Sequence, residues 1–293
     1  MTHHYHGASR EAACPICKSE DIFIYAYVQE FTVLKCRNCD LLWVPGVTKE
    51  QLRLFYTQSY FTSNTDYGYR DYLSDEGIIR VNARPILRKL QSLSRGSSGR
   101  KLLEVGCACG FLLDEARKEG WQAYGVELSS DVQKYAVNKL GLNVFHGTLD
   151  EVQFEDKSFD VVLIIGTIEH LNDPVATISE TGRILKKGGL LVIQTMNTKG
   201  PIRLYRLIPP EHLFYFSLAN LTLLLHSEGF EVVKASSCNW GKYRISEALF
   251  RFLRLILYRI GIKSSNVFLS RLPTSKLMLK VPSNEMLVIS QKR

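Results

Sequence analysis

Residues 101–196 alternate short apolar runs with amphipathic stretches, and this alternation constrains the fold more than any other feature. The apolar runs are KLLEVG, QAYGVE, NVFHG, FDVVLIIG and GLLVIQTM, which begin at residues 101, 122, 143, 159 and 189. Between them lie stretches with helical spacing, such as 129–141 and 173–186. Continuous apolar strands separated by helices are typical of parallel sheets covered on both faces. The sequence therefore predicts an α/β domain, which residues 218–236 and 285–293 complete with one helix and two strands.

The loop EVGCACG, residues 104–110, follows the first of these strands, where ligands bind in open parallel sheets. Gly106 and Gly110 let the backbone bend sharply and approach a ligand without an intervening Cβ atom. The loop matches neither G-x-G-x-x-G nor G-x-x-x-x-G-K-[ST], and Glu104 would repel a pyrophosphate. These residues favour a cationic or neutral ligand over a nucleotide phosphate.

The stretch LLEVGCACGFLL resembles the first motif of class I S-adenosylmethionine (SAM)-dependent methyltransferases, an acidic residue followed by G-x-G-x-G. The resemblance implies a Rossmann-like seven-stranded core, with Glu104, Gly106 and Gly110 around the amino-acid and ribose parts of SAM. Ala108 stands where the family has its middle glycine. Glu127, which ends the next strand, is implied to accept hydrogen bonds from both ribose hydroxyls.

Later stretches resemble the same family and imply the remaining cofactor contacts. In FHGTLDEV, Thr148 replaces the usual acidic residue, and Leu149 becomes the expected apolar neighbour of the adenine. The further cofactor residues that we predict are Tyr72, Cys107, Ala108, Leu128, Leu149, Ile165, Gly166 and His170. We expect the side chains of Cys107 and Cys109 to be small fillers and not metal ligands.

Four of the seven cysteines form two Cys-x-x-Cys pairs, Cys14 with Cys17 and Cys36 with Cys39, separated by eighteen residues. This spacing is typical of a zinc ribbon, in which four thiolates complete a tetrahedral shell. Because all four positions are cysteine, no coordination site is left for water, and we predict a structural zinc over residues 13–47. The alternative is four unligated core cysteines. An odd number of cysteines, with four so closely paired, also favours a reducing compartment.

Residues 48–95 are rich in tyrosine and end in a helical pattern. The clustered tyrosines are Tyr56, Tyr60, Tyr67, Tyr69 and Tyr72. They form either a lid over a ligand or a packing surface between two lobes, and the sequence leaves both open. The tract SRGSSGR that follows has linker composition. We therefore predict a tail over 1–12, the ribbon over 13–47, a tyrosine-rich helical lid or linker over 48–95, and a methyltransferase domain over 96–293.

The stretch PPEHLFYFS, residues 209–217, is expected on a loop above the carboxyl edge of the sheet, where a methyl acceptor must enter. Together with the four-cysteine ribbon, it resembles zinc-ribbon methyltransferases that modify sugars and other small metabolites. The resemblance implies His212 as general base, Glu211 as the residue that orients or charge-stabilises it, and Tyr215 as a secondary candidate. The alternative is that His212 has a structural role and holds the loop in place by packing.

The pair Glu169 and His170 resembles the E-H pair of many small-molecule methyltransferases. The sequence shows no third metal ligand at a suitable spacing from this pair. A single histidine more often has a structural role, fixed by hydrogen bonds, than a catalytic one. We therefore interpret the two residues as structural parts of the cofactor side of the site, and not as catalytic residues.

The net charge of +8 is concentrated in a basic insert, residues 241–282, which holds nine Lys or Arg and one acidic residue. Within it, residues 244–263 place arginines along one stripe of an otherwise apolar helical pattern. We favour a helix that packs on the domain or across a dimer; the alternative is an interfacial helix on an anionic membrane. Nucleic acid is a less favoured partner, because the stripe lacks interleaved exposed aromatics. No apolar run is long enough to span a bilayer, so we expect a cytoplasmic protein, with membrane association left open.

Taken together, these features predict SAM-dependent methyl transfer to a small molecule. The expected acceptor is a sugar, or a nucleotide- or lipid-linked sugar, methylated at oxygen or carbon. Two alternatives stay open. One is an RNA methyltransferase that uses the ribbon to bind nucleic acid, and the other is a non-catalytic SAM- or zinc-dependent interaction protein.

Overall fold

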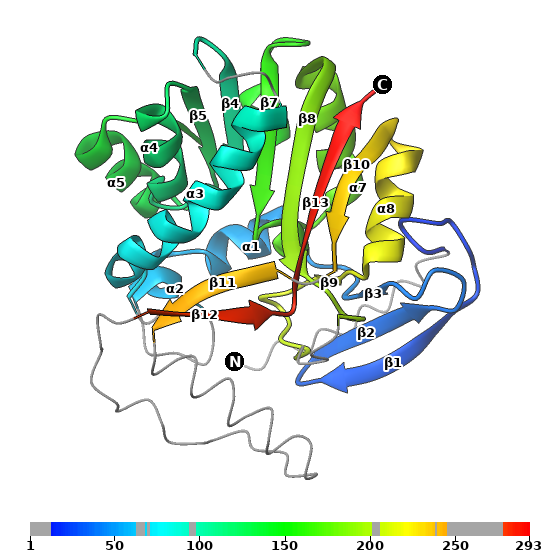
Figure 1. Cartoon of the computed structure of the whole chain (residues 1–293). Helices are drawn as coiled ribbons and strands as arrows, with labels where there is room; N and C mark the ends of the chain where they lie inside the picture. The colour runs from blue at the N-terminus through cyan, green and yellow to red at the C-terminus, as the bar shows by residue number, and fades with distance from the viewer. Residues whose placement is uncertain are drawn as a thin grey trace.

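The computed structural model describes residues 13–62, 68, 71–93, 98–200, 206–237, 239–244 and 278–293. The main strands are β4 (Lys101–Val105), β5 (Gln122–Glu127), β6 (Asn143–His146), β7 (Phe159–Ile165), β8 (Leu185–Met196), β10 (Phe230–Ser236) and β13 (Glu285–Lys292). They form one sheet in the order β10-β13-β8-β7-β4-β5-β6 (Figure 1). β13 runs antiparallel to the other six strands of this sheet, which are parallel to one another. The predicted Rossmann-like seven-stranded core is confirmed.

Helices cover both faces of this sheet, because successive strand residues point to opposite sides. The covering helices are α3 (Glu76–Leu93), α4 (Phe111–Lys118), α5 (Ser130–Leu140), α7 (Pro174–Ile184) and α8 (Leu218–Ser227). Val161 and Leu163 of β7 pack in one core with residues of α3, α4 and α5. Val162 and Ile164 pack in the other core with residues of α7 and α8. Burial on both faces explains why residues 161–165 of β7 are all apolar.

A second sheet joins the N-terminal lobe to the core. Its strands, in order, are β1 (Ile22–Val28), β2 (Phe31–Cys36), β3 (Leu42–Trp43) and β9 (Phe214–Tyr215). β9 belongs to the stretch that we predicted as a loop, and for these two residues the prediction is wrong. Leu42 pairs with Tyr215, and the Val44 amide donates to the Leu213 carbonyl at 2.8 Å. Residues 213–216 are buried, so their backbone groups need partners, and the ribbon supplies them.

The tyrosine-rich segment folds into α1 (Lys49–Phe55), α2 (Gln58–Thr62), the 3-10 helix η1 (Leu73–Asp75) and α3. Helices α1 and α2 lie at the end of the sheet toward which the parallel strands point (Figure 1). Tyr60 and Phe61 are buried in a cluster with Ala108 from the loop after β4. The segment therefore packs directly on the core. Tyr67 and Tyr69 lie outside the described residues, and the domain boundaries that we predicted stay predictions.

The two ends of the basic insert pair as an antiparallel two-stranded sheet, β11 (Asn239–Arg244) with β12 (Met278–Ser283). Arg244, which we placed at the start of a helical stripe, is instead the last residue of a strand, because it pairs with Met278 in this ladder. The rest of that stripe lies outside the described residues, so the packing and membrane interpretations of 244–263 stay predictions. Within the described part of the chain, no helix is both long and apolar enough to cross a membrane.

Candidate active site

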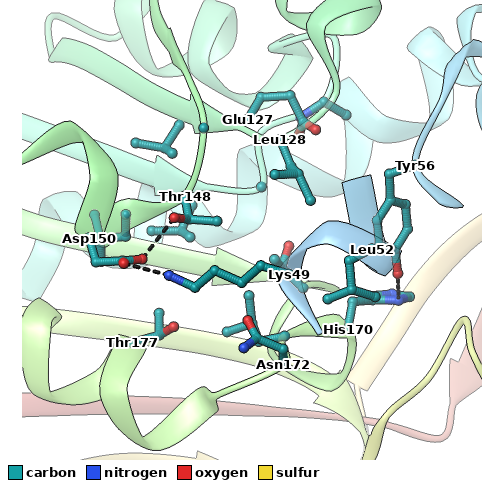
Figure 2. A pocket seen from close by; sticks show the side chains of 18 of the residues that line it. Lys49, Leu52, Tyr56, Glu127, Leu128, Thr148, Asp150, His170, Asn172 and Thr177 are labelled. Atoms are coloured by element: carbon teal, nitrogen blue, oxygen red, sulfur yellow. Dashed lines mark hydrogen bonds and ion pairs between the residues drawn. The ribbon is translucent and has the colours of Figure 1, made fainter. Parts of the chain in front are cut away.

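A cavity of about 320 Å³ opens at the carboxyl ends of β4, β5, β6 and β7. The 3-10 helix η2 (Ile168–His170) and the short helix α6 (Leu149–Val152) also contribute to its wall. Parallel strands bring their carboxyl ends to one edge, so residues distant in sequence meet there (Figure 2). The predicted cofactor residues that line the cavity are Tyr72, Gly106, Ala108, Glu127, Leu128, Leu149, Ile165, Gly166 and His170.

The loop after β4 bends through three left-handed residues. The φ angles of Gly106, Ala108 and Gly110 are 72°, 47° and 78°. A Cβ atom on Gly106 would lie 2.5 Å from the side chain of Thr167, and one on Gly110 would lie 2.6 Å from Leu142. Both positions therefore require glycine for space as well as for conformation. Ala108 adopts the same left-handed region with a side chain present, which costs free energy.

Glu127 ties this loop to the end of β5. One carboxylate oxygen accepts a hydrogen bond from the Ala108 amide at 2.8 Å, and the other accepts one from the Ser129 amide at 2.8 Å. Burial raises the pKa of Glu127, while these backbone hydrogen bonds oppose the rise. Each oxygen keeps a second lone pair, so the carboxylate can still accept hydroxyl groups from a ligand in the cavity.

Three predicted cofactor residues, Glu104, Cys107 and Gly110, do not line the cavity. Glu104 is 5% exposed, and its Oε2 has no hydrogen-bond partner among the described residues. Burial, and then the charge of Glu127, raise the pKa of Glu104 well above its ordinary value. The Cys107 sulfur lies 2.6 Å from the place that a Cβ on Gly125 would occupy, so it fills space against β5 as expected.

Helix α1, from the segment that we left open as a lid or a packing surface, forms a wall of the cavity, although its residues were not predicted at the site. Lys49 and Leu52 line the cavity, as does Tyr56 just after the helix. The Lys49 ammonium lies 2.5 Å from the Asp150 carboxylate, which also accepts a hydrogen bond from the Thr148 hydroxyl (Figure 2). Lys49 and Asp150 are 101 positions apart, and no local pattern around either residue signals their contact.

His170 lies where the cavity meets residues 209–217, which we call the acceptor loop. Its Nδ1 lies 2.5 Å from the Glu211 carbonyl oxygen and 2.9 Å from the Tyr56 hydroxyl. The Tyr56 hydroxyl donates to the same carbonyl at 3.1 Å, and the Tyr60 hydroxyl donates to the Glu211 carboxylate at 2.9 Å. The tyrosine-rich segment therefore contacts both the cavity and the acceptor loop.

The three predicted catalytic residues, Glu211, His212 and Tyr215, lie beside the cavity and do not line it. The His212 ring packs edge to face on the His170 ring, with the ring centroids 4.8 Å apart. Burial, and then the charge of His170, lower the pKa of His212 to about 3, so this imidazole is neutral at pH 7 but weakly basic. Among the described contacts none joins the Glu211 carboxylate to His212. Tyr215 is buried, and its hydroxyl accepts a hydrogen bond from the Ile208 amide at 3.0 Å.

Glu169 precedes His170 in η2 and is buried beside the acceptor loop. Its Oε2 makes no hydrogen bond of normal geometry among the described residues, but the Thr195 hydroxyl is close enough to lower the pKa of this carboxyl. Burial raises the pKa of Glu169 to about 7. The Glu169 carbonyl accepts a hydrogen bond from the Leu213 amide at 2.8 Å, which fixes η2 against the loop.

Comparison with known proteins identifies the family. A sequence profile for a methyltransferase domain matches residues 78–235, more than half of the 293-residue chain. The chain belongs to the methyltransferase domain family. The matched region starts within α3 and ends within β10, so it includes all the strands that end at the cavity. The strand order gives this methyltransferase-family protein the class I SAM-dependent architecture.

Curated relatives resemble part of the chain. A probable S-adenosylmethionine-dependent methyltransferase from Mycolicibacterium smegmatis is 34% identical over 145 residues, which cover 48% of this chain and 56% of that protein. A ubiquinone biosynthesis O-methyltransferase from Methylococcus capsulatus is 30% identical over 122 residues, which cover 40% of this chain and 52% of that protein. The chain thus spans about half the length of the curated relatives it matches.

Solved structures show the same fold at low sequence identity. The magnesium protoporphyrin IX methyltransferase of Synechocystis PCC 6803, solved with bound SAH, has a TM-score of 0.54 and 12% identity, covering 84% of this chain and 100% of that one. The YcgJ protein of Bacillus subtilis has a TM-score of 0.52 and 15% identity, covering 72% of this chain and 99% of that one. At these identities the likeness concerns the fold alone.

The cavity of this methyltransferase-family protein fits the cofactor of its family. SAM carries positive charge on its sulfonium and amino groups, and the buried Glu104 oxygen without a partner would be stabilised by a cation. The left-handed loop after β4 leaves no side chain at Gly106 between the backbone and a ligand. Glu127 offers free lone pairs at the end of β5, where ribose hydroxyls bind in related sheets.

The four ribbon cysteines of this methyltransferase-family protein fit a tetrahedral metal. Their ligand atoms all lie within 4.8 Å of one another, with Cys14 and Cys39 sulfurs 3.6 Å apart and Cys17 and Cys36 sulfurs 3.5 Å apart. Zinc–sulfur bonds of about 2.3 Å place the sulfurs about 3.8 Å apart, whereas a disulfide needs about 2.05 Å. After each pair the chain turns through a left-handed residue, Lys18 or Asp40. The residue that follows each Cys-x-x-Cys pair therefore has nearly the same φ angle, 60° for Lys18 and 61° for Asp40.

Proposed function

We propose that this protein binds SAM in the 320 Å³ cavity and transfers its methyl group to a small molecule. The observation that carries the proposal is that residues from four strand ends, each predicted to contact SAM, line one cavity. In related doubly wound sheets this edge is the ligand site. We further propose that the four-cysteine ribbon holds a structural zinc, since its sulfur positions suit one.

The cofactor would lie along the cavity wall in a defined direction. Glu127 would accept the ribose hydroxyls, and Leu128 and Leu149 would flank the adenine. The loop containing Gly106 and Ala108 would approach the amino-acid part, with the buried Glu104 charge behind it. SAM supplies an electrophilic methyl group on a sulfonium. The chain therefore needs to align the acceptor and to exclude water more than to supply strong acid or base chemistry.

The acceptor would enter beside His170, where the tyrosine-rich segment and the acceptor loop meet. The Methylococcus capsulatus relative, named as a ubiquinone biosynthesis O-methyltransferase, supports a small-molecule acceptor. A sugar or sugar-linked acceptor is the finer proposal, and it rests on the resemblance of PPEHLFYFS and the ribbon to sugar-modifying enzymes. His212 is the candidate base: its lowered pKa keeps the imidazole neutral, with one ring nitrogen able to accept a proton, but it also makes this imidazole a weaker base than an ordinary histidine.

Calorimetry of SAM binding tests this proposal. We expect wild-type protein to bind SAM and Glu127→Ala to bind it about 10- to 100-fold more weakly, because charge-assisted hydrogen bonds to the ribose are lost. Glu155→Ala, which removes an exposed carboxylate from the loop before β7, is the matched control and should bind like wild type. Unfolding curves of both variants separate lost binding from lost folding.

A second measurement addresses the acceptor. Transfer of a labelled methyl group from SAM should be detected with at least one member of a panel of sugar nucleotides and hydroxylated small molecules. Absence of SAM binding by folded wild-type protein would overturn the proposed function. Transfer to RNA, but to no small molecule, would overturn the proposed acceptor class.

A further inference from the structure

Two ion pairs join α1 to α6 at one end of the cavity. The Lys49 ammonium lies 2.5 Å from the Asp150 carboxylate, and its side chain extends from α1 to that residue (Figure 2). One helical turn later, the Arg53 guanidinium lies 2.5 Å from the Glu151 carboxylate. Lys49 and Asp150 line the cavity, whereas Arg53 and Glu151 do not. The second pair can therefore act on the cavity only through the helices that carry it.

The two carboxylates of α6 are held in place before they meet α1. One Glu151 oxygen accepts a hydrogen bond from the Thr148 amide at 2.9 Å and caps α6, while the other oxygen accepts from Arg53. Asp150 accepts a hydrogen bond from the Thr148 hydroxyl at 2.8 Å. A carboxylate that is already fixed loses less side-chain entropy when it forms an ion pair. Helix α6 therefore presents two preset anionic positions to α1.

Helix α1 has few other attachments to the core. Among its seven residues, all of them described, only Leu52 is buried, and Leu54 is 71% exposed. So short a helix is marginal on its own, because nucleation is costly. Segments that bury little apolar surface open locally at a low free energy. The two ion pairs are thus a substantial part of what holds α1 on the cavity.

Both ion pairs are exposed enough to break reversibly. The Lys49 and Asp150 side chains are 38% and 58% exposed, and those of Arg53 and Glu151 are 38% and 37% exposed. Ion pairs that solvent reaches are individually weak, and dissolved salt screens them. We therefore expect α1 to leave and return without unfolding of the sheet.

Helix α1 covers the part of the cavity where the adenine is proposed to lie. Leu52 of α1 and Leu149 of α6 both line the cavity and belong to the same buried cluster. After its last turn α1 leads into Tyr56, whose hydroxyl donates to the Glu211 carbonyl of the acceptor loop at 3.1 Å. A displacement of α1 would therefore open the cavity at the adenine end.

We propose that α1 gates cofactor exchange, and that SAM enters and S-adenosylhomocysteine leaves when its ion pairs to α6 break. This inference rests on the proposed binding of SAM in the cavity. Arg53 and Glu151 are then positioning residues, because they act on exchange through α1 and do not line the cavity. The gate sets the residence time of the cofactor and leaves the methyl-transfer step itself unchanged.

Release of labelled SAM into an excess of unlabelled SAM tests the gate. Arg53→Gln and Glu151→Gln should each release SAM about 1.5- to 5-fold faster than wild type, because one exposed ion pair is lost. The double variant should be no faster than the faster single variant, since both substitutions remove the same pair. Arg53→Lys keeps the charge and should restore a rate close to that of wild type. Lys134→Gln, which removes an exposed lysine from α5, is the control and should release SAM like wild type.

The salt dependence of release gives a second readout. Between about 0.1 M and about 1 M salt the screening length falls from about 10 Å to about 3 Å. The release rate of wild type should therefore rise with salt more steeply than that of the double variant.

Hydrogen exchange of the ligand-free protein tests the gate without SAM. The Tyr56 amide donates to the Leu52 carbonyl at 2.8 Å and reports on the last turn of α1. Its exchange should accelerate about 1.5- to 5-fold in Arg53→Gln and Glu151→Gln, and should not change in Lys134→Gln.

The outcomes distinguish the gate from the proposed function. Wild-type release rates in both single variants, or additive effects of the two substitutions, would overturn the gate. Unchanged exchange at the Tyr56 amide in both variants would also overturn it, whether or not SAM binds. Calorimetry that detects no SAM binding by folded wild-type protein would overturn the proposed function alone.

Discussion

At the residue scale, the cavity depends on two buried carboxylates with different hydrogen bonding. Glu127 accepts hydrogen bonds from two backbone amides, whereas Glu104 keeps an oxygen without a partner among the described residues. A nearby positive charge stabilises the ionised form of a carboxyl group, while burial stabilises its neutral form. The ligand-free and SAM-bound states should therefore differ in the protonation of Glu104.

We predict that SAM affinity rises with pH because of Glu104. Burial raises the pKa of this group well above 4.5, so the ligand-free protein holds a proton that SAM must displace. Affinity should increase with pH until the raised pKa is passed, and then level off. Glu104→Gln should remove the pH dependence and weaken binding at high pH about tenfold. Calorimetry over a pH series provides the measurement, Glu155→Gln is the control, and an unchanged slope in Glu104→Gln would contradict the prediction.

Ala108→Gly should stabilise the ligand-free protein. The alanine has a φ of 47°, and a left-handed conformation costs a residue with a Cβ about 1–2 kcal/mol. Glycine relieves this cost but adds about 0.4–1 kcal/mol of unfolded-state entropy. The net gain in the free energy of unfolding should be about 0.5–1 kcal/mol, measured by denaturant unfolding. Ala123→Gly in β5, where no left-handed angle occurs, should be destabilising, and a loss of stability in Ala108→Gly would contradict the argument.

At the element scale, α3 is held on α4 by a buried ion cluster. Arg80 is 13% exposed at its side chain and lies 2.6 Å from Asp114 and 3.0 Å from Glu115. The same guanidinium lies 2.8 Å from Glu76 on its own helix. The side chains of Asp114 and Glu115 are only 5% and 8% exposed. These carboxylates depend on cationic partners more than surface carboxylates do.

Arg80→Ala should therefore be strongly destabilising. Removing one member of a buried ion pair costs about 3–5 kcal/mol, and we expect the lower value, about 3 kcal/mol, because Lys118 and Arg117 still pair with Asp114. Denaturant unfolding provides the measurement. Arg88→Ala removes an exposed arginine from the same helix and should change the free energy of unfolding by less than about 0.5 kcal/mol. Equal effects of the two substitutions would refute this account of α3.

At the scale of the whole molecule, the four-cysteine ribbon and the acceptor loop share one sheet. β9 lies beside β3, and the chain that enters β9 is hydrogen-bonded both to Val44 of the ribbon and to Glu169 of the core. The Asn220 side chain also donates to the Cys39 carbonyl at 3.3 Å. The ribbon therefore positions the loop that carries His212, although the ribbon itself lies outside the cavity.

Loss of the ribbon metal should loosen the acceptor loop and leave the cofactor cavity intact. For Cys39→Ser we expect hydrogen exchange at the amides of Val44 and Leu213 to accelerate at least about tenfold, because β3 loses its anchor. SAM affinity should change little, since β4, β5 and β7 build that site. Arg37→Ala, an exposed change within the same knuckle, is the control. Unchanged exchange at Leu213 in a zinc-free Cys39→Ser protein would contradict this coupling.

The sequence by itself determined the strands of the seven-stranded sheet, the loop after β4 and the paired cysteines. Each is a local signal: apolar periodicity defines a strand, Gly106 and Gly110 permit a left-handed turn, and Cys-x-x-Cys spacing places two sulfurs on one knuckle. Because parallel strands align their carboxyl ends, the cofactor residues at those ends could be predicted before their contacts were known.

Only the tertiary structure decided which distant segments meet. It placed Lys49 against Asp150, added β9 to the ribbon sheet, and brought His212 to Glu169 and His170. These contacts join positions from about 40 to more than 100 residues apart, and no local pattern encodes them. Burial also decided the chemistry of these groups, since it raises the pKa of Glu169 and lowers that of His212. Residue type fixes which groups can ionise, but the packing around them fixes which do.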